Sequence, residues 1–487
     1  MKNILMTMVV LLCPLTLQAQ PLKAFPTAEG FGKFASGGRG GKVVEVTNLN
    51  NSGEGSLRWA LTEGGRENAT IVFRVSGIIT LETDIRAKLN HVTIAGQTAP
   101  GEGILYRGGK LNLGGSRNVI IRNLRGRIGL RGDKDFIKGG SIGIENADTI
   151  MIDHCCFGWS GEENMTIYDN HFTTVQWCII HEGLYNAGHQ KGNRSYACQW
   201  GGSPATFHHN LLAHNYNRSA RLNGASNHSQ DRNVFMEYQN NVNYNWGKPN
   251  SCYGGENEAG EGSTHECNFV GNYYKPGPAT PANSFFMQLS KARKGKTLTG
   301  PSLWFFSGNK MKGNKDVTKD NWLAVDNQTG FDVKELKSAQ LVYPSVFYPE
   351  KNAFNYEVYK TPVESADKAY KRVLSKAGTV HRDVVERRVV DEVRNGSASY
   401  RGTQGSAGFI DSPADAEGWP LYAEAVPVAD QDHDGMDDAW ELKNGLDPSN
   451  SEDRNVVLSN EGYTALEVYL NSLMGEKILV KKGNFRR

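Results

Sequence analysis

The chain of 487 residues lacks several features that would point to its function at once. Its formal net charge is only +2, so its composition demands no nucleic acid or other highly charged partner. It contains seven cysteines but no paired CxxC motif, which argues against a zinc site. No apolar run beyond residue 20 is long enough to cross a bilayer. We therefore expect a soluble monomer with no membrane span and no nucleic-acid partner.

The one extended apolar run lies at the start of the chain. Residues 1–20, MKNILMTMVVLLCPLTLQAQ, combine a Lys near the front, a short apolar core and small residues near Ala19. This pattern is typical of a secretory signal peptide and is too short for a membrane span. It predicts export to the periplasm, the cell surface or the medium. Removing it leaves six cysteines, of which Cys155 and Cys178 fit either a disulfide or two buried thiols.

A short pattern then recurs along the middle of the chain. Its apolar anchors are separated by 31, 23, 32, 31 and 31 residues, and they are Ile121, Ile152, Val175, Phe207, Tyr238 and Phe269. A repeat of this length is typical of a solenoid, in which each repeat buries its apolar face by stacking on its neighbours.

The columns of the aligned repeats indicate the kind of solenoid. The position after each anchor is mostly polar, so the anchors lie on short strands with alternating faces. Three residues past the anchor, Asn210, Asn241 and Asn272 form a column that suits a ladder of amide side chains. Helical spacing of 3.6 residues is absent from these segments. We predict a right-handed parallel β-helix over residues 21–325.

The pattern changes after residue 325. Residues 326–420 are expected to pack back on the β-helix and to be partly helical. Ser365 begins an amphipathic stretch that ends at Gly378, and a second helix is predicted from Asp383 to Arg394.

Residues 421–487 contain a candidate calcium loop, DQDHDGMDDAWE. It places four carboxylates and one glycine at the positions that a calcium loop requires: Asp430, Asp432, Asp434, Gly435 and Glu441. Two prolines occupy the stretch where the first helix of an EF-hand would lie. We therefore predict a loop–helix calcium module closed by the helix in GYTALEVYLNSLM, similar to those of dockerins and thrombospondin-type repeats.

The outer wall of a β-helix forms a long rigid groove that suits an extended polymer. Asp153 follows an anchor directly, Glu162 follows the same anchor by ten residues, and Arg218 follows a later anchor by eleven. By this count Arg218 projects near Glu162, two coils away. Carboxylates and an arginine on one wall leave room for a hydrated cation and a substrate carboxylate.

The same segments resemble a known family. IMIDHCCFGWSGEE, HEGLYNAGHQKG and FHHNLLAHNYNRSAR are similar to the signature segments of pectate lyases of polysaccharide lyase family 1, here in a bacterial form with a C-terminal calcium loop. The resemblance runs from AFPTAEGFG through GFIDSPADAEGWP to the C-terminal module, and so covers nearly the whole mature chain.

The resemblance implies calcium-assisted β-elimination of de-esterified polygalacturonate, giving unsaturated oligogalacturonides. It implies Ca²⁺ bound by Asp153 and Glu162, Arg218 as the base, and Lys191 and Arg221 as ligands of substrate carboxylates. The sequence departs from the family pattern at three expected positions, which carry Thr166, Gly183 and Asn223.

Two other functions suit the same architecture. A β-helical polygalacturonase would use a pair of carboxylates to hydrolyse the same polymer, but the aspartate-rich motifs typical of that family are absent from the repeats. A non-catalytic pectin-binding surface protein would use Arg218 and Arg221 as simple carboxylate clamps.

Overall fold

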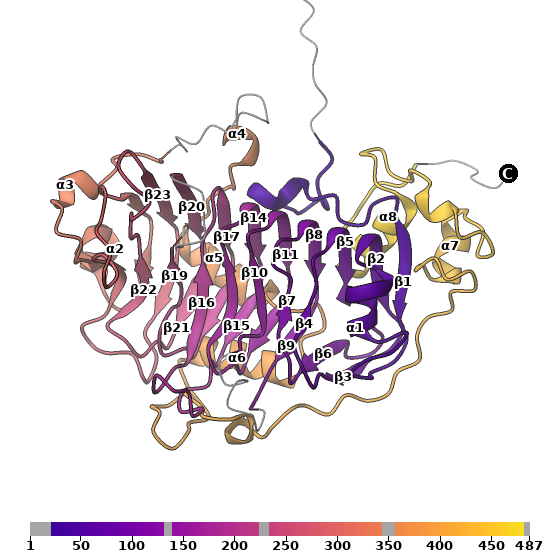
Figure 1. The fold of residues 1–487 in the computed structure, drawn as a ribbon, viewed down its shortest axis with the longest axis horizontal. Coiled ribbons are helices and arrows are strands. Elements are labelled where there is room, and N and C mark those ends of the chain that lie inside the picture. Colours follow the sequence, from indigo (N-terminus) through magenta and orange to yellow (C-terminus); the bar gives the residue numbers. More distant parts are fainter. Residues whose placement is uncertain (1–20, 131–138, 224–232, 343–355, 482–487) are drawn as a thin grey trace, which may run out of the picture.

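The structure is a computed structural model and describes residues 21–130, 139–223, 233–342 and 356–481. The predicted signal peptide lies outside these residues. The described chain winds into a right-handed parallel β-helix, in which each coil after the first contributes one strand to each of three sheets (Figure 1). All three sheets are parallel, as the predicted fold requires.

The first strand of each coil belongs to a ten-stranded sheet, here called sheet A. Its strands, in spatial order, are β1 (Lys42–Val46), β2 (Glu67–Phe73), β5 (Asn90–Ala95), β8 (Arg117–Arg122), β11 (Asp148–Asp153), β14 (His171–Gln176), β17 (Ala205–His208), β20 (Asn233–Gln239), β23 (Thr264–Val270) and β26 (Leu303–Ser307).

The second strand of each coil belongs to a nine-stranded sheet, sheet B. Its strands are β3 (Gly77–Thr80), β6 (Ile104–Arg107), β9 (Arg125–Arg127), β12 (Cys156–Gly158), β15 (Ile179–His181), β18 (Leu211–Ala213), β21 (Val242–Tyr244), β24 (Tyr273–Lys275) and β27 (Lys310–Met311).

The third strand of each coil belongs to sheet C, also of nine strands. They are β4 (Ile85–Arg86), β7 (Leu111–Asn112), β10 (Ile142–Glu145), β13 (Glu163–Tyr168), β16 (Tyr196–Trp200), β19 (Arg221–Leu222), β22 (Asn250–Gly254), β25 (Phe285–Leu289) and β28 (Val325–Asn327).

The predicted anchors align in one interior column of sheet A. Ile121 pairs with Ile152, Ile152 with Val175, and the register continues through the later anchors to Phe306. All the anchors are buried in the central core of the solenoid. Aromatic rings extend this stacking, because the centroids of Tyr238 and Phe269 lie 4.9 Å apart in a stacked pair.

An asparagine ladder lies at the corner between sheets A and B, as predicted. The backbone N–H of Asn210 donates to Oδ1 of Asn241 at 3.0 Å, and that of Asn241 donates to Oδ1 of Asn272 at 2.9 Å. The ladder continues through Asn309 to Asn321. Each buried amide thereby satisfies backbone groups that leave the sheet ladder at the turn.

The cysteines of the described chain are all free and buried. Cys155 and Cys178 lie in the column that the asparagines occupy in later coils, and the N–H of Cys178 donates to Asn210. Of the two interpretations of Cys155 and Cys178, the structure therefore has the pair of small buried thiols and not the disulfide.

Short helices follow or flank the solenoid. α1 (Leu57–Trp59) caps early coils, while α2 (Lys315–Lys319), α3 (Val333–Leu336) and α4 (Tyr356–Tyr359) follow the last ones. α5 (Ala366–Lys376), capped by Ser365, and α6 (Val384–Asn395), capped by Asp383, occupy the predicted positions. Both pack on sheet B through an apolar cluster that includes Val373, Val389 and Leu211. No helix among the described residues is both long and apolar enough for a membrane span.

The C-terminal residues return to the first coils. α7 (Asp438–Asn444) and α8 (Ala465–Leu473) lie at the end of the solenoid where β1 begins (Figure 1). The helix predicted in GYTALEVYLNSLM is α8, and the stretch before the acidic loop contains no helix. Met436 and Leu466 belong to the apolar cluster that joins this region to Ala95.

Asp153 belongs to this docking and not to an open groove. Its carboxylate is fully buried and accepts hydrogen bonds from Arg122 at 2.8 Å and from Gln176 at 2.8 Å. Arg122 also contacts Asn471 and Glu476 of the C-terminal region. Burial by itself would raise the pKa of Asp153, but His154 and Arg122 hold it well below its usual range.

One prediction concerns the asparagine ladder. Asn241→Ala removes an amide that bonds both the preceding and the following rung. Each buried group left without a partner costs about 1–3 kcal/mol, so the free energy of unfolding should fall by at least that amount. Denaturant unfolding measures the change. Asn50→Ala, at an exposed position in the loop after β1, is the matched control, and equal stability of the two variants would contradict the role of the ladder.

A second prediction distinguishes a structural role of Asp153 from a catalytic role. Asp153→Asn removes one of the two carboxylates that pair with the buried Arg122 and leaves Glu476 as the other, so stability at neutral pH should fall by less than the about 3–5 kcal/mol of a fully broken buried pair. Because the folded-state pKa is lowered, this stabilisation exists above pH ~4 and is lost as the pH falls further. Thermal melts of the variant and of Asp391→Asn, an exposed control, measure it. An unchanged melting temperature would contradict the structural role.

Candidate functional site

Sheet C carries a continuous row of outward-facing polar and aromatic side chains. Adjacent strands place the members of this row in direct register: Thr166, Gln199, Arg221, Tyr253, Gln288 and Asp326. Their neighbours in sequence, such as Cys198 and Leu222, point into the core. The row therefore forms one outward face along the solenoid axis, with one position every ~4.8 Å, and this face is called the groove of sheet C below.

Arg218 enters this groove through an irregularity in the sheet. Tyr196 pairs with Asn217, and Gln199 pairs with Arg221. Two residues lie between Tyr196 and Gln199, but three lie between Asn217 and Arg221. The later coil therefore carries one extra residue. An extra residue of this kind is a β-bulge, which bends the strand and redirects side chains. The bulge contains Arg218.

The guanidinium of Arg218 is held among charged and aromatic groups. It forms a close ion pair with Glu163 and lies 4.3 Å from the ring centroid of Tyr196. Its Nε is buried and has no hydrogen-bond partner within the described chain. Burial lowers the pKa of Arg218, and Arg221 lowers it further, while Tyr253 opposes the shift.

Glu162 lies beside this pair but is engaged by other groups. It accepts two hydrogen bonds from Arg194, at 3.0 and 2.9 Å, and its Oε2 lies 2.8 Å from Nε2 of His189. Lys191 is exposed on the loop that carries His189 and Arg194. The structure thus brings Lys191 onto the loop beside Glu162 but shows no contact between the two.

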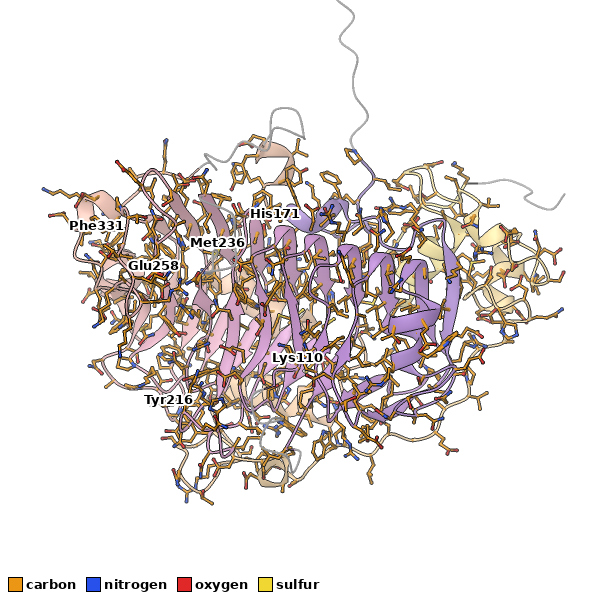
Figure 2. The ribbon with its side chains drawn as sticks, viewed as in Figure 1. Lys110, His171, Tyr216, Met236, Glu258 and Phe331 are labelled. Carbon is orange, nitrogen blue, oxygen red and sulfur yellow. The ribbon has the colours of Figure 1, made fainter. Side chains whose placement is uncertain are left out.

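Arg221 extends the array of charges to the next coil. Its Nη2 lies 3.1 Å from Glu256 and its Nη1 donates to Gln199 at 3.3 Å. Beyond it, Tyr253 and Gln288 line a cleft of about 530 Å³ on the later coils. Glu258, near that end of the solenoid in Figure 2, pairs with Arg293.

The structure does not bring Asp153 to this groove. Asp153 ends β11 at the corner between sheets A and B, whereas Glu162 and Arg218 flank strands of sheet C. The expectation that Asp153 and Glu162 share one wall is therefore wrong, because nine residues of chain carry the coil around to another face. Glu163 is the acidic residue that meets Arg218 instead.

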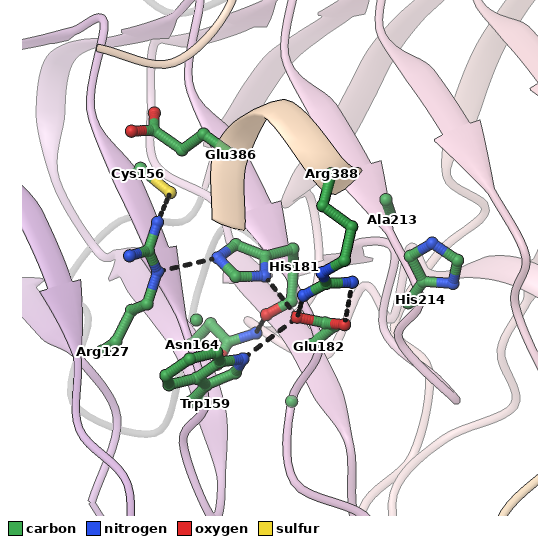
Figure 3. Close-up of polar contacts among 12 residues, drawn as sticks. Arg127, Cys156, Trp159, Asn164, His181, Glu182, Ala213, His214, Glu386 and Arg388 are labelled. Atoms are coloured by element: carbon green, nitrogen blue, oxygen red, sulfur yellow. Dashed lines mark hydrogen bonds and ion pairs between the residues drawn. The ribbon is translucent and has the colours of Figure 1, made fainter. Parts of the chain in front are cut away.

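A second cluster of titratable groups lies under α6 (Figure 3). Glu182 accepts hydrogen bonds from Trp159, from His181 and, through both oxygens, from Arg388 of α6. Both His181 and Glu182 are fully buried, and burial lowers the pKa of His181. These groups are enclosed and mutually satisfied, so the cluster anchors α6 and offers no surface to a substrate.

The predicted calcium loop gathers its carboxylates as expected. Oxygens of Asp430, Asp432 and Asp434 lie within 4.8 Å of one another, and those of Asp434, Glu441 and Asp453 form an overlapping group. Asp453 lies outside the loop motif, twelve residues beyond Glu441, so the spacing of the motif gives no signal for it. Within the described chain, these are the only groups of three or more such ligands.

The environment of this acidic group suits a cation. Carboxylate oxygens of Asp432, Asp434, Glu441 and Asp453 are buried and accept no hydrogen bond from the described chain. Burial, with repulsion among the carboxylates, raises the pKa of Asp434 to about 7 and that of Glu441 to about 8. Buried carboxylates without donors require a positive charge or protonation, and a set of oxygen ligands suits calcium.

Several groove residues were missed by the sequence analysis. Glu163, Arg194, Tyr196, Tyr253 and Glu256 contact the predicted residues or each other. The repeat pattern follows sheet A, and the loops that lead to sheet C differ in length between coils, so columns on that sheet could not be aligned. The one available signal was the EE pair at Glu162 and Glu163.

Comparison with known proteins places this chain among polysaccharide-degrading enzymes. It is 32% identical over 459 residues to a probable pectate lyase C of Aspergillus fumigatus, covering 93% of this chain and 94% of that protein. It is 34% identical over 470 residues to the Emericella nidulans protein of the same name, covering 96% of both. A pectate trisaccharide-lyase of Bacillus licheniformis is 27% identical over 208 residues, covering 39% of this chain and 53% of that protein.

Solved structures were also compared. The major cedar-pollen allergen gives a TM-score of 0.46 at 16% identity, covering 72% of this chain and 93% of its own. A pectate lyase from Bacillus sp. N165 in complex with trigalacturonate gives 0.42 at 15% identity, covering 72% and 98%. No family model matches the chain. The identity to the fungal relatives extends over nearly all of both chains, and on that ground the chain belongs to the pectate lyase family.

Proposed function

We propose that this protein is a secreted pectate lyase that cleaves de-esterified polygalacturonate by β-elimination. The observation that carries the proposal is Arg218, which a bulge directs into the groove of sheet C and whose Nε has no hydrogen-bond partner in the described chain. The family membership supports the reaction class. Export after removal of residues 1–20, and a monomeric state, remain predictions.

In this proposal Arg218 acts as the base. Burial and the positive charge of Arg221 lower its pKa, which increases the small neutral fraction that can accept a proton. Arg218 removes the proton from C5 of a uronate. The C5–H electrons form the C4–C5 double bond, the C4–O4 bond breaks, and the leaving oxygen takes a proton from water. Arg221 and Lys191 bind substrate carboxylates.

Calcium fits the groove only with substrate present. Glu162 and Glu163 are each engaged by an arginine, and the described groove contains no group of three ligands. Uronate carboxylates would supply the further oxygens that the ion needs. A bound calcium ion withdraws charge from the carboxylate and acidifies the adjacent C5 proton. Asp153, buried against Arg122, has no part in this site.

The alternatives are less well supported. A hydrolase needs one protonated carboxylic acid and one carboxylate base. Glu162 and Glu163 are each held by an arginine, so neither is free to serve as the acid or the base of such a pair. A purely binding protein would not need an arginine redirected by a bulge and left with an unsatisfied donor.

The product of the reaction tests this function. With calcium and polygalacturonate, the purified protein should release oligogalacturonides that absorb ultraviolet light, because elimination leaves a double bond conjugated with the carboxylate. Excess chelator should abolish the absorbance. Arg218→Lys should lower single-turnover rates by ~10²–10⁴-fold, the range for a lost general base, with little change in Kd.

Arg117→Lys, the same substitution at an exposed position remote from sheet C, is the control and should retain full activity. Saturated reducing ends without ultraviolet absorbance would indicate the hydrolase. Near-wild-type turnover by Arg218→Lys would overturn the assignment of the base.

We further propose that the C-terminal acidic group binds a structural calcium ion through Asp430, Asp432, Asp434, Glu441 and Asp453. The support is the set of buried carboxylate oxygens without donors. Its role would be to stabilise the region that docks on the first coils, where Arg74 lies 3.4 Å from Asp430.

This calcium site predicts a stability effect without a catalytic one. Calcium at 100 times its Kd stabilises a folded state by about 2.7 kcal/mol, so calcium should raise the melting temperature of the wild type. Asp430→Ala with Asp434→Ala should remove most of this rise and leave kcat nearly unchanged. Asp367→Ala with Asp391→Ala, exposed on α5 and α6, is the control. Equal calcium shifts in both double variants would contradict the site.

A further inference from the structure

A large cleft lies away from the groove of sheet C. It has a volume of about 930 Å³ and opens at the corner between sheets A and B. Arg122, His154 and Trp177 form its floor, and α5 with the start of α6 forms one wall. Residues 474–477 of the C-terminal region and residues 26–27 form the other wall. In a three-sheet solenoid this corner faces away from sheet C.

The floor of the cleft has little free charge. Arg122 is neutralised by Asp153 and Glu476, with which it forms ion pairs of 2.8 and 2.6 Å. Trp177 is stacked on His209 with a centroid distance of 4.3 Å and is covered by Arg372 at 4.9 Å. The floor is thus a rigid, largely satisfied surface, and any ligand must be recognised by the rim.

The rim is basic. Lys376, Arg387 and Lys477 line the cleft, are exposed, and form no ion pair within the described chain. Arg382 adds a fourth positive charge, although its guanidinium donates to the carbonyls of Leu374 and Ala377 at the end of α5. The only acidic lining residue besides Glu476 is Glu102. The excess of positive charge selects for an anionic ligand.

The shape of the cleft favours an extended ligand over a single small anion. Its floor follows the solenoid axis, because His154 and Trp177 directly follow the adjacent strands β11 and β14 of sheet A. Its volume is near the upper end of the ~300–1,000 Å³ range of small-molecule pockets. Basic side chains stand on both walls, so carboxylates along one chain can be bound from either side.

We propose that this cleft is a second, non-catalytic binding site for a carboxylate-bearing oligosaccharide, a galacturonate chain. The identity of the ligand rests on the proposed function. A chain held at this corner cannot reach Arg218 on the opposite wall. The site therefore tethers the enzyme to the polymer while the groove of sheet C cleaves another segment, which raises the local substrate concentration.

The test uses the full chain with Arg218→Lys, so that substrate survives, and titrates it with a defined oligogalacturonate in calcium. We expect two binding sites per chain by calorimetry. Adding Lys376→Glu with Arg387→Glu should weaken one site at least ~10-fold, since two charge-assisted contacts are lost, and leave the other unchanged. Lys319→Glu with Lys371→Glu, exposed and outside the cleft, makes the same change in net charge and should leave both sites.

With Arg218 intact, the cleft variant should keep the kcat of the wild type on soluble oligogalacturonate and lose activity on insoluble polymer at low loading. One site in the parent chain, or equal weakening by the cleft and control variants, would overturn the inference. Binding of dextran sulphate, another polyanion, is measured as well. If the cleft variant binds dextran sulphate more weakly but binds galacturonate as before, the inference is also overturned. Failure of the proposed function is distinct, since it would appear as missing ultraviolet-absorbing product from the wild type.

Discussion

The in-register stacking of successive coils is the constraint on which the rest of this structure depends. Each interior column holds one apolar residue per coil, and a shift by one residue would turn every buried side chain outward. The asparagine ladder fixes the register at the corner between sheets A and B, because the Asn210 amide bonds backbone groups of the preceding coil and the amide of Asn241 in the next coil. This register also aligns the outward row of sheet C. The groove is thus a consequence of the core.

The sequence predicted the parts of the fold that repeat along the chain. The anchors, the ladder and the helices after Ser365 and Asp383 carry local patterns that need no knowledge of distant contacts. The calcium loop is equally local, and its four predicted carboxylates come together. Asp453 could not be predicted in the same way, because it reaches the loop only through tertiary packing.

The groove was predicted less completely, for a geometric reason. Counting residues from an anchor gives a position within a coil only when the turns of successive coils have equal length. The count placed Arg218 two coils from Glu162, and β13, β16 and β19 are indeed successive strands of sheet C. The count failed for Asp153. Asp153 follows its anchor by one residue and Glu162 follows the same anchor by ten, and these two positions lie on different faces of the coil. Two residues with one anchor in common need not have a wall in common.

The two arginine–carboxylate groups at Asp153 and at Arg218 show why burial and charge alone do not identify a catalytic residue. Arg122 and Asp153 satisfy each other and their neighbours behind the wall, so their ion pair holds the C-terminal region in place. Arg218 is also paired with a carboxylate, yet it retains a buried donor without a partner and stands where the sheet is interrupted. A group that must react with a substrate requires an open face on which the substrate can contact it. On this criterion the bulge on sheet C is the better place for chemistry, although the IDH segment carried the more conspicuous motif.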